Sequence, residues 1–394
     1  MQRIVTVLLQ MYALFLAWLH SLGGVQTDEA KYLLDIPYPH PPLLRWIMGL
    51  TSTIPFQEML WRVALATLLV QAVWLVWDMT RALPRPARIA AASAWLLSPS
   101  VFVQGGTVML APVTALVALS MLWLLHRQKN GTSVTPETWG FLWATALLSA
   151  YQGVVLLPLA VAGAWRADGS AWRKIGAVVL PVVLLAIVTL GNPLALATML
   201  IHADEGVRLT LAEHTEGALG LWLFAGAWVV SVIGVVGLLM QRRWEILGGF
   251  TLTTLFVLGS ASFPFYAILF LPWITEGVRA VVQSIPACRG KAFSVFLIAG
   301  IALGWLWIPP ILHISLAPSE ARLVMRKVAE HVTVGEVAIS GSFGHQWQYE
   351  SPLPVRRYVP GKLDGIVAVV CLDPCEEPQG WLKIDAPVDA WVRS

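Results

Sequence analysis

Ionisable side chains gather in one short segment after the first apolar run of the chain, TDEAKYLLDIPYPHPPLLRW at residues 27–46. Asp28 and Glu29 are adjacent, so on a helix their side chains point about 100° apart, and one can face a cavity while the other caps or orients the helix. A carboxylate at membrane depth is costly unless water, a cation or a ligand shares its site. The pair is therefore a candidate functional site, and the alternative is two solvated acids in a surface loop.

The elements that position this segment are membrane helices. Of the 394 residues, 57% are hydrophobic and 12% charged, and the mean hydropathy is +0.70, which excludes a soluble domain with a polar surface. A span needs about 20 apolar residues. The apolar runs predict an all-α polytopic protein of about 11 transmembrane helices, at 4–22, 59–78, 88–104, 107–126, 138–150, 152–165, 175–191, 218–240, 245–260, 263–282 and 292–311.

Basic residues set the expected orientation. The runs 138–150 and 152–165 are short, and we interpret them as a hairpin that turns at Ala150–Gln152, because this returns the following cluster to the same side as the other basic loops. The loops on that side hold Arg81, Arg85, Arg88, Arg127, Lys129, Arg166, Arg173, Lys174, Arg242, Arg243, Arg279, Arg289 and Lys291. The opposite loops, 23–58 and 192–217 among them, hold Lys31, Arg45, Arg208 and, at a boundary, Arg62. We therefore expect a cytoplasmic N-terminus and a C-terminus outside.

The first apolar run starts like a signal peptide, with a basic residue and then an apolar stretch, but no small-residue cleavage site follows it. We expect a retained helix. A bacterial inner membrane with a periplasmic active face is the most economical setting, and the endoplasmic reticulum would give the same outer-face chemistry.

Beyond Ile311 the composition changes to that of a small α/β domain, at 312–394, outside the membrane. A helix is expected from Ser319 to His331 and β-rich runs at Glu336–Ser340, Gly365–Leu372 and Trp381–Ile384. Cys371 and Cys375 fit a disulfide or two unpaired thiols better than a zinc site, because no second ligand pair follows.

Two motifs in residues 27–46 resemble the membrane glycosyltransferases of the C-type fold. They are Asp-Glu-Ala-x-Tyr at 28–32 and Tyr-x-His-Pro-Pro-Leu-x-x-Trp at 38–46. The nearest resemblance is to the protein O-mannosyltransferase and lipid A aminoarabinose transferase group. The segment from Leu148 to Pro158, with Tyr151 and Gln152, is similar to the family's short hairpin. Phe263–Pro272, with Tyr266, and Val337–Tyr358 are similar to a late segment and to the outer α/β domain.

The resemblance implies transfer of a sugar from a polyprenyl-phosphate carrier to a hydroxyl of a lipid, glycan or protein acceptor. Within it, Asp28 is the expected general base, with Glu29 beside it as the second catalytic acid. The leaving phosphate needs cations and hydrogen-bond donors. The expected donor-phosphate ligands are Lys31, Tyr32, His40, Arg45 and Arg208, and the expected substrate contacts are Tyr151, Gln152 and Tyr266.

The sequence gives little indication of a bound cofactor. We find no nucleotide-binding fingerprint, which a donor already loaded on lipid does not need. No metal ligand is assigned, although a divalent cation is possible, and no nucleic-acid partner is expected. The second outer loop, 192–217, contains His202, His214 and four acids, but their spacing matches no zinc pattern, and a solvated amphipathic loop or a lid is the simpler interpretation.

Three departures from the family pattern favour an alternative. Val113 stands where the family commonly has an aspartate, Ala150 where it often has a lysine, and the basic residue before Tyr266 is missing. A catalytically inactive subunit that binds polyprenyl phosphate or scaffolds a complex is therefore the second hypothesis, and a transporter is a weaker third. His345, Trp347 and Tyr349 alternate, as in one half-buried strand or a glycan-contacting surface.

Overall fold

The structure is a computed structural model of the whole chain, and it describes residues 2–36, 40–192, 210–260, 264–307 and 318–393. The chain forms two compact units. The first unit comprises Met1–Ala17, Tyr38–Trp46 and Val63–His313, and the second comprises Trp18–Pro37, Ile47–Arg62 and Ile314–Ser394. The second unit thus contains residues 314–394 together with two segments from the N-terminal part of the chain.

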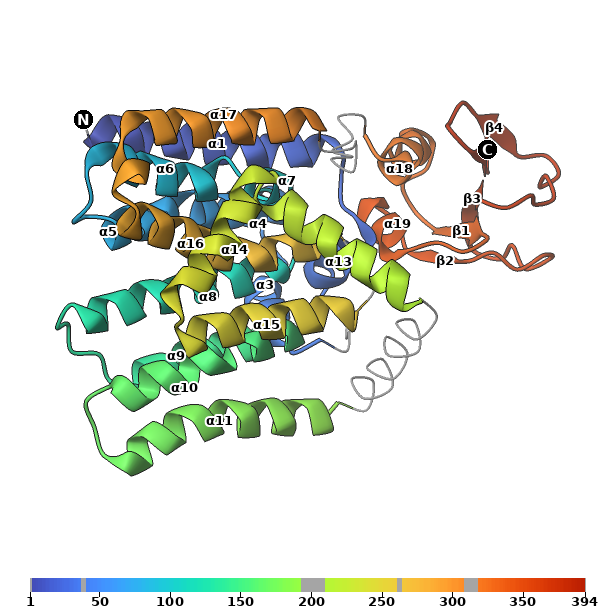
Figure 1. Cartoon of the computed structure of the whole chain (residues 1–394). Coiled ribbons are helices and arrows are strands. Elements are labelled where there is room, and N and C mark those ends of the chain that lie inside the picture. The colour runs from blue at the N-terminus through green and yellow to red at the C-terminus, as the bar shows by residue number, and fades with distance from the viewer. Residues whose placement is uncertain (1, 37–39, 193–209, 261–263, 308–317, 394) are drawn as a thin grey trace. The chain divides into compact units, whose positions relative to one another are not determined.

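Helices make up the first unit (Figure 1). Its apolar runs are suited to the bilayer, where no water can bond to the backbone. A helix satisfies the backbone hydrogen bonds within each segment. The elements, some of which extend into the second unit, are α1 Gln2–Leu22, α3 Leu43–Gly49, α4 Gln57–Gln71, α5 Val73–Met79, α6 Arg85–Leu96, α7 Pro99–Gln104, α8 Ala111–Lys129, α9 Pro136–Ser149, η1 Tyr151–Leu156, α10 Leu157–Arg166, α11 Ala171–Leu190, α13 Leu211–Ala225, α14 Val229–Gln241, α15 Trp244–Leu258, η2 Pro264–Phe270, α16 Leu271–Ser284, η3 Pro286–Arg289 and α17 Lys291–Trp307.

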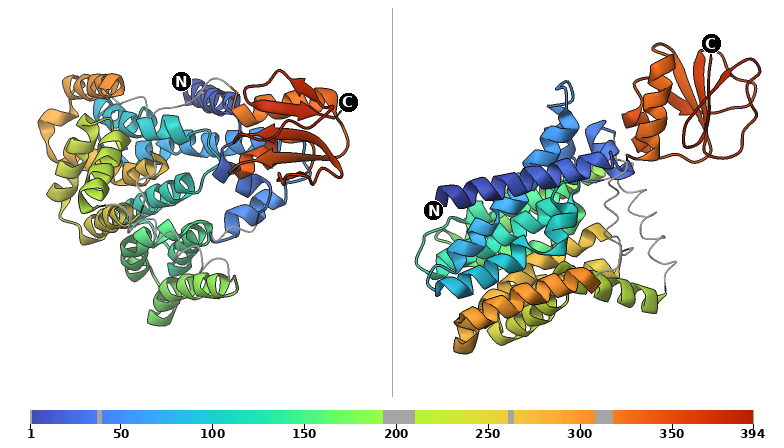
Figure 2. Two further views of the ribbon diagram at one scale, coloured as in Figure 1. Left: turned by 90° about the vertical axis from the view of Figure 1, so that its right-hand side faces the viewer. Right: turned by 90° about the horizontal axis from the view of Figure 1, so that it is seen from above.

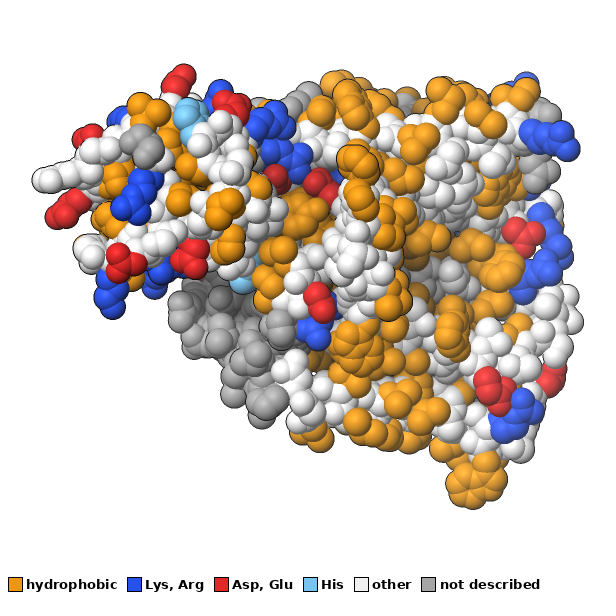
Figure 3. All heavy atoms as spheres, turned by 180° about the vertical axis from the view of Figure 1, so that it is seen from behind, with side chains coloured by type: hydrophobic (Ala, Val, Ile, Leu, Met, Phe, Trp, Pro, Cys, Tyr) orange, Lys and Arg blue, Asp and Glu red, His pale blue; other side chains and the backbone are white. Residues whose placement is uncertain are grey.

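Membrane character is evident in these helices. Among the described residues, four helical stretches are long and apolar enough to cross a bilayer, Arg3–Leu22, Gln57–Met79, Ala171–Leu190 and Phe265–Ser284. On the face seen in Figure 3, hydrophobic side chains are spread over the helical body, and charged side chains gather at its right-hand edge. Several other apolar helices are shorter than a full span, so this test does not confirm the expected count of eleven.

The sequence predicted one straight span at 218–240, and this prediction is wrong. The run is divided into α13 and α14, which meet at an angle of 97°. The break lies at Gly226–Trp228, where Ala227 and Trp228 take positive φ angles of 51° and 63°. The hydroxyl of Ser231 accepts a hydrogen bond from the N–H of Gly226 and donates to the carbonyl of Trp222, so it satisfies backbone groups freed by the break. Helical periodicity alone could not reveal this bend.

The expected hairpin at 138–165 is confirmed. Helix α9 ends at Ser149, and the indole N–H of Trp143 donates to the carbonyl of Gly153 across the turn (3.1 Å). At the far end, Arg173 forms an ion pair with Glu137 at the start of α9 (2.6 Å). The start of α11, which follows the hairpin, therefore lies beside the start of α9, so the hairpin begins and ends on the same side.

Close helix packing in the first unit depends on small residues. Helices α14 and α16 cross where Gly237 faces Gly277, and a Cβ atom added to Gly237 would lie 1.9 Å from the carbonyl oxygen of Gly277. Small residues at such crossings let helix backbones approach closely in a membrane, where dispersion replaces the hydrophobic effect as the driving force. Any larger residue here would separate the two helices.

A five-stranded sheet with helices packed on it forms most of the second unit (Figure 2). Its strand order is β2-β1-β3-β5-β4, with β2, β1 and β3 parallel and β5 antiparallel to both β3 and β4. The elements are β1 Glu336–Ser340, β2 Val355–Arg357, β3 Ile366–Cys371, β4 Leu382–Ile384, β5 Asp389–Val392, α18 Glu320–His331, α19 His345–Glu350 and α2 Thr27–Leu33.

The expected helix at 319–331 and the three β-rich runs are confirmed within a residue at each end. The strand interpretation of His345, Trp347 and Tyr349 is wrong, because these residues lie on helix α19, where only Trp347 is buried. Cys371 and Cys375, whose state the sequence left open, form a disulfide at the end of β3.

Candidate functional site

Helix α2 carries the acidic pair, and it gives the two carboxylates different surroundings. The helix begins at Thr27, where the carboxylate of Glu29 accepts a hydrogen bond from the N–H of Gln26 (2.9 Å), as in a capping box. The side chain of Asp28 is 40% exposed and pairs with Lys31 one turn later (2.8 Å). Glu29 is buried, with 1% of its surface exposed. One acid therefore faces solvent while the other anchors the helix.

Glu29 is neutralised by Arg62, a buried residue on α4. The guanidinium Nη1 lies 2.9 Å from Oε1 of Glu29 and Nη2 lies 3.2 Å from Oε2, so the contact is bidentate. Nη2 also donates to the carbonyl oxygen of Gly24 (2.9 Å), and Nε donates to Glu58 (2.8 Å). The position and direction of α2 are thereby fixed against the start of α4.

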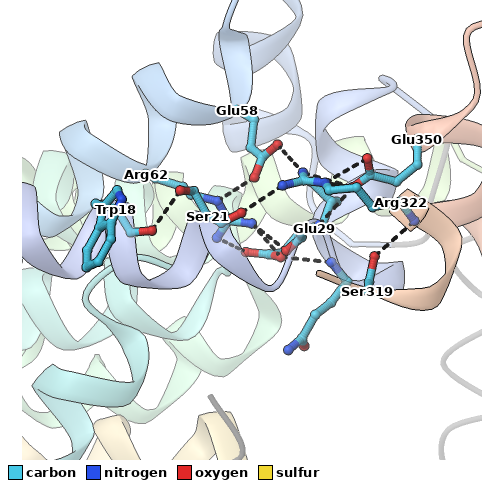
Figure 4. Close-up of polar contacts among 11 residues, drawn as sticks. Trp18, Ser21, Glu29, Glu58, Arg62, Ser319, Arg322 and Glu350 are labelled. Atoms are coloured by element: carbon cyan, nitrogen blue, oxygen red, sulfur yellow. Dashed lines mark hydrogen bonds and ion pairs between the residues drawn. The ribbon is translucent and has the colours of Figure 1, made fainter. Parts of the chain in front are cut away.

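The charges continue into the C-terminal domain (Figure 4). The second oxygen of Glu58 accepts from Arg322 on α18 (2.8 Å), and Nε of Arg322 lies 2.9 Å from Glu350 on α19. Arg322 also donates to the carbonyl of Ser21 (2.7 Å). We call Glu29, Arg62, Glu58, Arg322 and Glu350 the ion network. Alternating signs let each charge compensate its neighbour in a region that is largely buried.

Electrostatics in the second unit follow from this network. Burial alone would lower the pKa of Arg322, but its hydrogen bonds to Glu350 and the nearby charge of Glu58 outweigh burial, so its pKa is raised. Burial and the same two carboxylates raise the pKa of Tyr349 to about 12. The phenol therefore stays protonated at neutral pH and can donate a hydrogen bond.

Gly24 has no room for a side chain. Its φ is +82°, and an added Cβ would lie 2.9 Å from the hydroxyl oxygen of Ser319 and 3.1 Å from Oε1 of Glu350. The first loop can therefore approach α18 and α19 closely only with glycine here.

An open cavity of about 720 Å³ lies beside the ion network within the second unit. It is lined by Ser21, Leu33, Leu34, Ser52, Ile54, Phe56, Gln57, Glu58, Met59, Arg322, Gln348, Tyr349 and Ser351. Glu58 and Arg322 belong both to the cavity wall and to the network. Asp28 is not one of the lining residues, so it faces solvent elsewhere on α2.

A second group of expected site residues meets in the first unit. The rings of His40 and Tyr151 lie 6.1 Å apart, and Tyr151 also shares a hydrogen bond with Thr189. Gln152 follows in η1 and is 6% exposed, and its buried Nε2 has no hydrogen-bond partner within the part of the chain that the structure describes. An unsatisfied buried amide is costly, and a bound hydroxyl or water would satisfy it.

The remaining expected residues are placed as follows. Tyr32 is buried on α2, and Arg45 is half-buried on α3. Tyr266 lies in an aromatic cluster, with its ring 5.5 Å from that of Phe256 and 4.6 Å from that of Phe265. Arg208 lies outside the described residues, as does His202. No group of three or more His, Cys, Asp or Glu side chains is arranged for a metal ion in the regions that the structure describes.

Sequence reasoning did not identify Glu58, Arg322 and Glu350, and it treated Arg62 only as a boundary charge. One signal was available, because an arginine four residues after a glutamate at the start of an apolar helix requires compensation. The partners in α18 and α19, however, lie more than 250 residues away in the sequence, and no local pattern connects them to α4.

Comparison with known proteins shows the fold. No protein-family model matches the chain, and no curated protein matches its sequence. Among solved structures, ArnT from Cupriavidus metallidurans in the apo state matches with a TM-score of 0.64 and 13% identity, over 100% of this chain and 98% of that one. ArnT bound to undecaprenyl phosphate matches with a TM-score of 0.61 and 13% identity, over 99% and 96%. The arabinofuranosyltransferase AftD from Mycobacteria (mutant R1389S) matches at 17% identity over 94% of this chain and 37% of its own, but its TM-score of 0.49 supports no inference.

The chain therefore has the fold of ArnT, a C-type glycosyltransferase fold, along its whole length. At the positions where the sequence departs from the family pattern, Val113 lies in the first turn of α8, and Ala150 is buried at the turn between α9 and η1.

Proposed function

We propose that this protein is a membrane glycosyltransferase that moves a sugar from a polyprenyl-phosphate carrier to a hydroxyl acceptor at the outer face of the membrane. The likeness to ArnT over the full length of both chains is the observation that carries the proposal. One of the matching ArnT structures is bound to undecaprenyl phosphate, which supports a carrier of that class here. The distribution of basic loops supports an outer active face, and a bacterial inner membrane is the most economical setting for it.

Asp28 is the general base of the proposed reaction. The acceptor hydroxyl attacks the anomeric carbon, the bond from that carbon to the phosphate oxygen breaks, and the hydroxyl proton passes to Asp28. The carboxylate of Asp28 is 40% exposed and forms an ion pair with Lys31 (2.8 Å), so an acceptor hydroxyl can reach it. The partly exposed carboxylate can exchange its proton with solvent after each turnover.

Cations and hydrogen-bond donors on the same segment stabilise the polyprenyl phosphate that leaves. Lys31, His40 and Arg45 have this role, together with Arg208, because negative charge develops on the phosphate as the bond breaks. Tyr151, Gln152 and Tyr266 contact the substrate, and the unsatisfied amide of Gln152 supports a polar ligand at that place. A divalent cation remains a candidate partner of the phosphate.

Glu29 acts as a positioning residue in this proposal, although the sequence suggested a catalytic role. Its oxygens accept hydrogen bonds from Arg62 and from the N–H of Gln26, and it is buried. A carboxylate whose oxygens are occupied by these donors and which is closed to solvent has no access to an acceptor hydroxyl. Its contribution is to hold α2, and with it Asp28, in one orientation.

Replacing Asp28 by asparagine tests the proposal. Purified protein in lipid nanodiscs is assayed with radiolabelled polyprenyl-phosphate sugars and candidate lipid, glycan and protein acceptors. We expect Asp28→Asn to lower the transfer rate by about 10²–10⁴-fold, the range of general-base catalysis. Glu330→Gln, which removes an exposed acid of α18 that pairs with Lys327, is the matched control and should transfer normally. Unchanged transfer by Asp28→Asn would refute its role as base.

The second candidate is a non-catalytic subunit that keeps this fold to bind polyprenyl phosphate or to scaffold a complex. Val113 and Ala150 favour it, because each places an apolar side chain where the family commonly has a charge. It predicts binding of polyprenyl phosphate that is the same in wild type and Asp28→Asn, and no transfer from any donor. Transfer by the wild-type protein would exclude it.

A further inference from the structure

The cavity beside the ion network has a lining suited to an uncharged polar ligand. Its two charged residues, Glu58 and Arg322, already pair with each other (2.8 Å). The other polar lining residues are serines, glutamines and a tyrosine, which offer hydroxyl and amide groups that donate and accept hydrogen bonds.

Electrostatics disfavour an anionic ligand in this cavity. The ion network contains three carboxylates and two guanidinium groups, so its net charge is −1. Both guanidinium groups already pair with carboxylates and donate hydrogen bonds to backbone carbonyls. A phosphate here would face excess negative charge with no available cation in the lining, so the cavity does not suit the carrier's headgroup.

Phe56 gives the cavity an exposed aromatic wall. Its side chain is 86% exposed although its backbone has a φ of +66°. A bulky residue in the left-handed region is strained, and such strain persists where the surrounding structure imposes it, often at binding sites. A flat apolar ring beside hydroxyl and amide groups matches the two kinds of surface that a sugar ring presents.

We propose that this cavity binds a neutral saccharide, as part of the acceptor of the transfer reaction. The ring of Phe56 lies against the apolar face of the sugar, and Gln348 and Tyr349 form hydrogen bonds with its hydroxyl groups. Leu33, Leu34 and Met59 contact an apolar continuation of the same molecule. That the saccharide is the acceptor rests on the proposed function, whereas its binding in this cavity does not.

The competing explanation is that Phe56 inserts into the membrane interface as an anchor. Leu50 provides the matched control, because it lies in the same connection between α3 and α4 and is 83% exposed but does not line the cavity. An anchor role predicts that the two residues behave alike, whereas a saccharide site predicts that only Phe56 matters.

The experiment measures binding of fluorescently labelled full-length protein, in phosphatidylcholine nanodiscs, to an array of immobilised neutral and phosphorylated glycans. We expect binding to neutral glycans that falls about tenfold in Phe56→Ala, the loss of about 1.4 kcal/mol of aromatic contact, and is unchanged in Leu50→Ala. Ser52→Trp, which places an indole at an exposed position of the lining, should also abolish it. No binding to any neutral glycan, preference for phosphorylated glycans, or equal losses in Phe56→Ala and Leu50→Ala would overturn the inference.

Glycan binding and sugar transfer are measured separately, so this inference and the proposed function can fail independently. Sugar transfer without glycan binding would refute the saccharide site alone. Glycan binding with no transfer by the wild-type protein would refute the transferase and leave the saccharide site standing.

Discussion

Replacing Glu29 by glutamine should weaken the anchoring of α2, although the two side chains have nearly the same size. The substitution removes the charge that compensates Arg62 and places an amide N–H₂ group against one of its guanidinium nitrogens. Breaking a buried ion pair typically costs about 3–5 kcal/mol. Arg62 keeps Glu58 as a partner, at 2.8 Å, so we expect the lower end, about 3 kcal/mol.

Hydrogen–deuterium exchange of the α2 amides measures this loss locally, which suits a large membrane protein better than a global melting curve. A cost of about 3 kcal/mol corresponds to roughly 100-fold faster exchange where α2 opens before the rest of the chain. Asp28→Asn is the comparison on the same helix. Its pair with Lys31 involves a carboxylate that is 40% exposed, and such pairs contribute about 0–1 kcal/mol, or at most about fivefold in exchange.

Equal exchange rates for α2 in Glu29→Gln and Asp28→Asn would refute this reasoning. That result would mean that the buried carboxylate does not hold the helix, and the division of the acidic pair into an anchor and a base would fail with it. Peptides from β3 serve as an internal control, because Glu29 does not pack in the core of the sheet.

Two further predictions concern the same unit. A double-mutant cycle of Glu58→Gln and Arg322→Met should give a coupling energy of about 1–2 kcal/mol in chemical unfolding, because the pair is largely buried and networked; additive effects would show that the two charges act separately. The pKa of Tyr349 is raised from 10.0 to about 12, so below pH 10 its phenol is protonated in folded and unfolded chains alike and its effect on stability is constant. As the pH rises from 10 through 12 the unfolded chain loses the proton first, so stability falls, and Tyr349→Phe should reduce that alkaline loss in unfolding titrations; an identical loss in both proteins would contradict the raised pKa.

Local sequence rules determined much of the architecture. Apolar length predicted the membrane helices, and the short halves of 138–165 predicted a hairpin, because an apolar segment needs a minimum length to span the bilayer. Composition predicted a small α/β domain at 312–394, and the helix and strands found there follow from local periodicity. The bend at 226–228 and helix α19 were missed because the first depends on two positive φ angles and the second on a six-residue pattern that fits a strand equally well.

The site was determined in part by sequence and in part only by tertiary structure. Residue types marked the segment at 27–46, and helical geometry implied that Asp28 and Glu29 would face different ways. Which of them would be buried depended on Arg62, 33 residues later, and the network that fixes Arg62 depends on Arg322 and Glu350 near the other end of the chain. Charges pair according to distance in space and to exclusion from water, and neither quantity is encoded in local sequence.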